Sequence, residues 1–346
     1  MTGAMTGMLA LLPKVVGALD WQRIRLVEAR RPIVLAYHRV CHPLPGHDAM
    51  SVSPDHFAAQ VAELAATREV VPLSRLLTTR SDRPLAAITF DDGYRDVVTQ
   101  GLPVLERHGC PATLFLATGY IGGTREFWWD ELPRVFRQGT LPRAVEVRVP
   151  GSDSVWRLGP DATTAEREAV LDAVWWLIDA LTPLQRADEI ARLADLLGCD
   201  LGMRPEFALL ADQEVAGLHG SLLDIGAHTV NHTRLTGLGA TERRQEIRDS
   251  QRRCRELTGR NPSAFAYPYG LCDPAAIRDV HDAGFDVGVT ISRATVRPGV
   301  DPLAVPRIPV GDWDRATFRR RIPAAPLLPS RALPTRQPVG GLAPAA

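Results

Sequence analysis

Two aspartates stand side by side at Asp91 and Asp92, between the apolar run Ala86–Phe90 and Gly93. A turn at Gly93 can aim both carboxylates into one cleft. Close carboxylates repel each other, so both ionise readily only when one of them binds a cation. The pair therefore favours one metal ligand and one general base. An N-cap aspartate with a solvated neighbour is the alternative.

Two histidines, His228 and His232, follow the apolar run Leu223–Ala227. Residues four apart share one face of a helical turn, so we expect such a turn to bring both imidazoles to one metal. Together with Asp92 they form a set that suits Zn²⁺, Co²⁺ or another divalent transition metal with an open position for water. Two unrelated surface histidines are the alternative interpretation.

An aromatic loop, Phe265–Gly270, follows a further apolar run. Pro268 and Gly270 restrict its backbone, so an amide there could point into the cleft and stabilise an oxyanion. A packed turn without a catalytic role is the alternative.

Two further polar residues are associated with apolar runs: His38 follows Ile33–Tyr37, and Arg307 lies within Leu303–Val310. Each also has a structural interpretation. The histidine could cap a strand end, and the arginine could form a surface salt bridge.

Apolar runs alternate with helical patterns along the chain, which predicts an α/β fold with a parallel sheet. About seven candidate strands favour a (β/α) barrel, whose site is built at the carboxyl ends of the strands. The expected strands are Ile33–Tyr37, Ala86–Phe90, Ala112–Leu116, Leu223–Ala227, Ser263–Tyr267, Asp286–Thr290 and Leu303–Val310. The expected helices are Pro54–Ala66, Arg95–His108, Thr241–Thr258 and Asp273–Ala283.

Three segments stand outside this alternation. Residues from about 122 to 212 are expected to form a mainly helical insertion, with a long helical stretch over Thr164–Leu197. Residues 1–30 are expected to form an amphipathic helix or arm, and residues 321–346 a disordered tail rich in proline and alanine.

Composition narrows the function classes. The chain has 346 residues, with 40 basic and 40 acidic side chains, so nothing predicts steering onto nucleic acid. Five cysteines without CxxC spacing argue against a disulfide framework. No apolar run reaches the roughly 20 residues of a membrane span, and residues 1–30 lack the pattern of a signal peptide. We therefore expect a cytoplasmic protein, with peripheral membrane contact through the N-terminal helix.

The three motifs Thr89–Gly93 (TFDDG), His228–His232 (HTVNH) and Tyr267–Gly270 (YPYG) occur in an order that resembles carbohydrate esterase family 4. These are the polysaccharide deacetylases with a NodB-homology domain, and the resemblance covers about residues 31–320. It implies a distorted (β/α) barrel that removes acetyl groups from glycans. It also implies that Asp91 is the general base, that Asp92, His228 and His232 bind the metal, and that the backbone amide of Tyr269 stabilises the oxyanion. Of the metals that suit this ligand set, we expect Zn²⁺ first.

The chain departs from this family pattern in two places. Many members carry an arginine where this chain has Ala266, and the late Leu-x-His motif that supplies a general acid is absent. We expect Arg307 to replace the missing arginine and His38 to act as acid or substrate ligand. Variants of the family with a Tyr-His pair after the first strand support the second expectation.

The function expected from these features is metal-dependent hydrolysis of acetyl groups, N-acetyl groups first, from a polysaccharide or amino-sugar glycan. An amidohydrolase acting on a small non-sugar amide or imide is one alternative. A glycan-binding pseudoenzyme that kept the metal and lost its acid is the other.

Overall fold

The computed structural model describes residues 30–43, 50–218 and 220–324. The chain divides into two compact units, one built from the described residues up to Thr118 and from Asp212 onward, the other spanning Gly119–Ala211. The expected N-terminal helix, apart from residue 30, and the expected tail beyond residue 324 lie outside the described residues. Across the described ranges, no helix is both long and apolar enough to cross a membrane.

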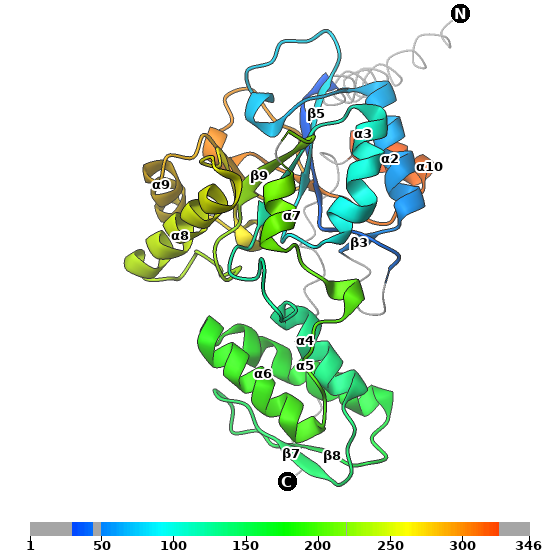
Figure 1. Cartoon of the computed structure of the whole chain (residues 1–346), viewed down its shortest axis with the longest axis vertical. Coiled ribbons are helices and arrows are strands. Elements are labelled where there is room, and N and C mark those ends of the chain that lie inside the picture. Colours follow the sequence, from blue (N-terminus) through cyan, green and yellow to red (C-terminus); the bar gives the residue numbers. More distant parts are fainter. Residues whose placement is uncertain (1–29, 44–49, 219, 325–346) are drawn as a thin grey trace, which may run out of the picture. The chain divides into compact units, whose positions relative to one another are not determined.

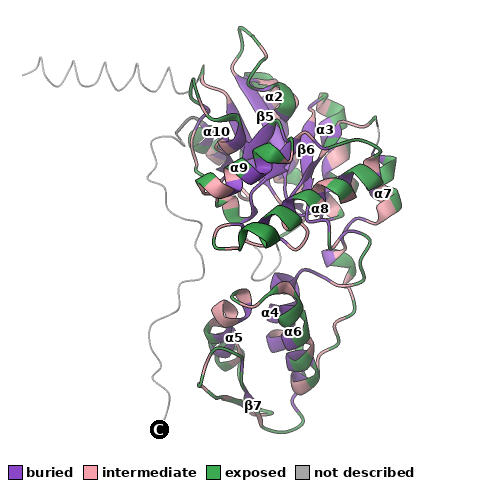
Figure 2. Ribbon diagram, turned by 90° about the vertical axis from the view of Figure 1, so that its left-hand side faces the viewer, coloured by how far each residue is buried: buried purple, intermediate pink, exposed green. Residues whose placement is uncertain are grey.

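The first unit contains a parallel sheet whose main path follows the order β11-β10-β9-β6-β5-β1-β12. Its central strands are buried on both faces, as continuous apolar runs require when helices cover a parallel sheet. Figure 2 shows these buried strands in purple among the surrounding helices. The predicted α/β fold with about seven parallel strands is confirmed. The strands are β1 Ile33–Tyr37, β5 Leu85–Phe90, β6 Ala112–Leu116, β9 Leu223–Ala227, β10 Ala264–Ala266, β11 Val287–Val289 and β12 Ile308–Pro309, with β4 Glu69–Val70 beside β5.

The segment around β12 closes the sheet into a distorted barrel. Val305 accepts a hydrogen bond from the amide of Thr290 at the end of β11, and its own amide donates to Gly288. On the opposite side of the segment, Val310 donates to Ala36 of β1. The predicted strand Leu303–Val310 is wrong in its extent: only β12 is a strand, and Pro302–Ala304 forms the short helix η5. Proline within the run removes the amide donors that a longer strand needs.

Helices surround this barrel, and two predictions about them need correction. The expected helix Arg95–His108 begins as a π-helix, η2 Val97–Gly101, before α3 Leu102–His108, because Pro103 cannot donate the regular hydrogen bond. Residues 321–324, expected in the tail, belong to α10 Arg315–Ala324, which packs on α2 and buries Phe318. The other elements of the unit are α2 Pro54–Thr67, α7 Asp212–Gly217, α8 Ala240–Thr258, α9 Pro274–Asp282, η1 Leu73–Arg75, η4 Pro268–Gly270 and the paired strands β2 Arg39–Val40 and β3 Ser51–Val52.

The second unit is mainly helical, with an antiparallel hairpin. The predicted stretch Thr164–Leu197 is two helices, because Thr182 caps a new helix and Pro183 stands at its first turn. The elements are α4 Trp128–Gln138, β7 Val145–Val147, β8 Trp156–Leu158, α5 Thr164–Asp179, α6 Pro183–Leu197 and η3 Pro205–Phe207.

Candidate metal and catalytic site

The residues predicted to do chemistry lie at the carboxyl edge of the barrel. Parallel strands present this edge together, so the loops after β1, β5, β9 and β10 meet there. Four non-glycine residues in these loops have left-handed backbone: Asp92 (φ 77°), Thr229 (64°), His232 (52°) and Tyr269 (60°). Such conformations cost free energy and persist only where the surroundings enforce them, which is typical of functional loops.

Asp92, His228 and His232 form a buried group whose ligand atoms all lie within 4.8 Å of one another. The Oδ1 atom of Asp92 is 3.7 Å from Nε2 of His228 and 3.5 Å from Nε2 of His232. Ligands about 2.0–2.2 Å from a tetrahedral ion lie about 3.4 Å apart, so the spacing fits one divalent cation. The donor set of one carboxylate and two imidazoles fits the same ion.

The local structure that joins the two histidines differs from the prediction. Residues 228–232 form a loop after β9 and not a helical turn. The left-handed backbone at Thr229 and His232 turns the chain so that both imidazoles still reach Asp92. The predicted proximity is found, while the predicted helical turn is wrong.

A hydrogen bond sets the tautomer of His228. Its Nδ1 lies 2.7 Å from the carbonyl oxygen of Ala266, which can only accept, so Nδ1 carries the proton. Burial lowers the pKa of His228, against the raising effect of the Asp91 carboxylate. The imidazole therefore presents an unprotonated Nε2 to Asp92, which is the form that binds a metal.

Strand β6 holds the two ligand loops together through its backbone. Ala117 donates to the carbonyl of Asp92 (3.1 Å), and Thr118 donates to the carbonyl of Thr229 (3.1 Å). The amide of His228 donates to Leu116 (2.9 Å). The end of β6 and the two residues after it thus hold the aspartate loop and the histidine loop together.

Asp91 forms a buried, two-pronged ion pair with Arg307. The guanidinium NH1 and NH2 groups lie 2.6 and 2.7 Å from Oδ1 and Oδ2 of Asp91. Arg307 is fully buried and Asp91 is 2% exposed. Burial alone would raise the pKa of Asp91, but Arg307, with the nearby His228 and His38, holds that pKa well below its usual range. Arg307 thus makes the contact predicted for the missing family arginine.

Several residues that sequence reasoning missed position Arg307. Its Nε donates to the carbonyl of Thr290 (3.1 Å), and its NH1 donates to the hydroxyl of Thr89 (3.1 Å). The ring of Phe115 lies 5.6 Å from the guanidinium carbon. A Cβ at Gly226 would lie 2.4 Å from that ring, so only glycine leaves the ring in place. Thr89, which belongs to the same TFDDG motif as Asp91, is the sequence signal for these contacts to Arg307.

His38 lies next to Asp91, with its Nε2 atom 3.9 Å from Oδ2. Its side chain is partly exposed, so it can reach a bound substrate. Burial lowers the pKa of His38 to about 4, outweighing the raising effect of Asp91. The imidazole is therefore neutral at pH 7 before substrate binds.

Tyr269 lies in the short helix η4 directly beside the histidine loop. Its ring is 4.9 Å from the ring of His232 and is 37% exposed. The guanidinium of Arg234 lies 4.5 Å above the same ring. The left-handed backbone at Tyr269 turns the loop at the carboxyl end of β10, and the oxyanion role of its amide stays a prediction.

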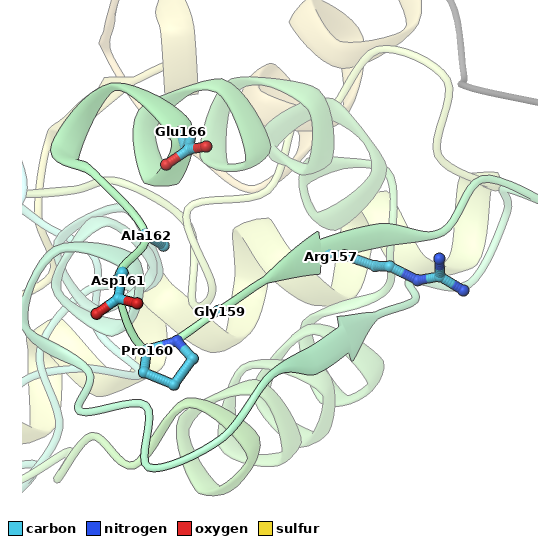
Figure 3. Close-up of a pocket in the computed structure, with 6 residues that line it drawn as sticks. All are labelled: Arg157, Gly159, Pro160, Asp161, Ala162 and Glu166. Atoms are coloured by element: carbon cyan, nitrogen blue, oxygen red, sulfur yellow. The ribbon is translucent and has the colours of Figure 1, made fainter.

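A separate hollow in the Gly119–Ala211 unit contains none of the predicted site residues (Figure 3). Two of its three charged side chains have partners: Arg157 pairs with Glu146, and Glu166 caps the start of α5 through Thr163. The hollow is lined by no histidine, so it lacks the donor set of the Asp92–His228–His232 group.

Comparison with known proteins agrees with this geometry. A family model described as polysaccharide deacetylase matches residues 78–141 and 209–288, and the unmatched stretch between them, residues 142–208, lies within the Gly119–Ala211 unit. A search of curated proteins finds no match.

Solved structures with a similar fold include two deacetylases and the protein IcaB. IcaB from Ammonifex degensii is 18% identical, with a TM-score of 0.56 over 86% of this chain and 97% of its own. A polysaccharide deacetylase from Bacillus cereus is 14% identical, with a TM-score of 0.55 over 84% and 69%. The Streptococcus pyogenes deacetylase PplD, solved with acetate, is 17% identical, with a TM-score of 0.50 over 84% and 98%. At these identities the likeness shows the fold.

A parallel barrel with an aspartate pair and two imidazoles at its carboxyl edge defines a hydrolase domain of the NodB-homology type. The chain contains a polysaccharide deacetylase domain, which the family model matches over residues 78–141 and 209–288, together less than half of the chain.

Proposed function

We propose that the chain removes acetyl groups, N-acetyl groups first, from a polysaccharide or amino-sugar glycan, with a divalent cation held by Asp92, His228 and His232. One observation carries the proposal: the Asp91–Arg307 ion pair lies directly beside the Asp92–His228–His232 group. A base held in its ionised form next to a cation site is what hydrolysis of an amide by water requires.

The cation would polarise the acetyl carbonyl and a water molecule at the site. Zn²⁺ is the first candidate because the ligand set is two imidazoles and one carboxylate, and Co²⁺ suits the same set. The protonated Nδ1 of His228, held by the Ala266 carbonyl, keeps Nε2 available for the ion.

Asp91 is the proposed general base that accepts the proton of the attacking water. Arg307 keeps its carboxylate ionised and fixes both oxygens. The backbone amide of Tyr269 is the proposed donor to the oxyanion that forms on the acetyl oxygen. His38, beside Asp91 and partly exposed, is the proposed contact to the leaving group, as a hydrogen-bond partner or as an acid. Because its imidazole is neutral at pH 7, it can protonate the departing amine only after it takes up the proton that Asp91 accepts from the water.

The match to the polysaccharide deacetylase model supports the proposed substrate class. The Streptococcus pyogenes deacetylase of similar fold was solved with acetate, the product expected here. An acetylated glycan is therefore the proposed substrate, and acetate and a free amine are the proposed products.

The test is acetate release from a panel of N-acetylated oligosaccharides and O-acetylated glycans, using metal-stripped protein with and without added Zn²⁺ or Co²⁺. We expect acetate only with added metal, and none from the His228→Ala variant. Metal shown to be bound without acetate from any glycan would contradict the proposal and favour an amidohydrolase acting on a small amide.

A further inference from the structure

Glu246 holds the loop between the two histidines from outside. Its Oε2 atom accepts hydrogen bonds from the backbone amides of Val230 (2.8 Å) and Asn231 (3.0 Å). Its Oε1 atom accepts from the side-chain amide of Asn231 (2.7 Å). One carboxylate therefore binds three N–H groups of the segment that joins His228 to His232.

This segment needs such a support because its backbone is unfavourable on its own. Thr229 and His232, at either side of Val230 and Asn231, both have left-handed backbone. Non-glycine residues in that region cost free energy and persist only when the surroundings enforce them. Hydrogen bonds to a charged acceptor are among the stronger ones in proteins, so three of them can offset much of this cost.

The helix that carries Glu246 is itself fixed to the barrel. Ile247 and Cys254 of α8 are fully buried, and the Cys254 sulfur lies 3.6 Å from the carbonyl of Gly226 in β9. Arg243 forms an ion pair with Asp279 of α9 (2.7 Å). Glu246 thus connects the strained loop to a rigid element that is anchored independently of it.

We infer that Glu246 is a positioning residue that sets the metal affinity of this site. It touches neither ligand imidazole in the contacts above, and it acts by holding the loop in the conformation that brings both imidazoles to Asp92. The inference rests on the proposed function, because it takes the Asp92–His228–His232 group to bind a divalent cation.

The experiment is a calorimetric titration of the metal-stripped full chain with Zn²⁺ and, separately, Co²⁺. For Glu246→Ala we expect metal binding to weaken about 10- to 100-fold, the usual effect of losing an outer-shell partner. Glu246→Gln should bind within a few-fold of wild type, because its amide oxygen still accepts from the backbone and Asn231 can turn its own amide to match. Glu256→Ala, at the exposed far end of the same helix, is the matched control and should bind like wild type.

Activity gives a second readout that separates positioning from a general loss of structure. If Glu246 acts through metal affinity, excess Co²⁺ restores acetate release in Glu246→Ala, whereas it does not restore Asp91→Asn. Asn231→Ala, which removes one bond from the loop side, covers the case in which Glu246→Ala does not fold. It should weaken metal binding by a smaller factor.

The outcomes distinguish the two hypotheses. Wild-type protein that binds neither metal would overturn the proposed function. Wild-type protein that binds metal, together with Glu246→Ala (or Asn231→Ala where that replaces it) binding equally tightly, would overturn the role of Glu246 alone.

Discussion

Replacing Arg307 by methionine would leave the carboxylate of Asp91 buried without its partner. The pair makes two charge-assisted hydrogen bonds of 2.6 and 2.7 Å, and both side chains are at most 2% exposed. Removing one member of a buried ion pair costs about 3–5 kcal/mol, because the remaining charge keeps its desolvation penalty. We therefore expect Arg307→Met to lower the free energy of unfolding by about 3–5 kcal/mol at pH 7.

The same reasoning predicts that the loss is not additive. Asp91→Asn leaves the guanidinium of Arg307 buried without a charge partner and should also destabilise the fold. The double variant removes both charges. Its loss in free energy of unfolding should therefore be smaller, by about 2–3 kcal/mol, than the sum of the losses in the two single variants. Urea denaturation followed by circular dichroism measures all four proteins.

Activity should respond more strongly than stability, because Arg307 also fixes the orientation of Asp91. A displacement of about 1 Å in a catalytic group costs about 100-fold in rate, so kcat/KM for acetate release should fall at least that far in Arg307→Met. Arg186→Met is the control: this arginine is also buried, but its hydrogen bonds lie within the Gly119–Ala211 unit. An Arg307→Met protein within about 1 kcal/mol of wild type and with unchanged kcat/KM would refute the reasoning.

Two further substitutions test the supports of the site, and a third tests the Gly119–Ala211 unit. Gly226→Ala would place a Cβ 2.4 Å from the Phe115 ring and should cost about 1–3 kcal/mol, with lower acetate release, both measured on the purified variant. Gly198→Ala, at φ 64° and 2.5 Å from the Thr140 carbonyl, should lower the thermal midpoint of the second unit while kcat/KM stays unchanged; lost activity would contradict it. Thr89→Val removes a hydroxyl that accepts from the buried guanidinium and should cost about 1–3 kcal/mol in urea; an unchanged midpoint would count against that bond.

The strands and the position of the site were open to prediction because buried parallel strands leave a strong local pattern. The runs Ile33–Tyr37, Ala112–Leu116 and Leu223–Ala227 match strands β1, β6 and β9 residue for residue. Polar residues at the ends of such runs must share the carboxyl edge of the sheet. The sequence alone therefore predicts that His228 and Asp92 lie close together.

Backbone conformations and contacts between distant residues were not open to prediction in the same way. A His-x-x-x-His spacing fits a helical turn, and only the left-handed backbone at Thr229 and His232 shows that a loop does the same work. Glu246, which supports the loop, lies 14 positions after His232 and 18 after His228, with no sequence pattern that links it to the loop. Tertiary contacts of this kind fix the geometry of the site, and the hydrophobic periodicity of the sequence does not reveal them.

Asp91 is the proposed general base, acting beside a metal held by Asp92, His228 and His232. The most direct test is acetate release by Asp91→Asn, loaded with Zn²⁺ and shown by metal analysis to hold as much metal as the wild type. We predict that this variant binds the metal and releases acetate at least 100-fold more slowly than wild type, in the range that loss of a general base costs. Undiminished acetate release from the metal-loaded variant would contradict the role of Asp91 as the general base.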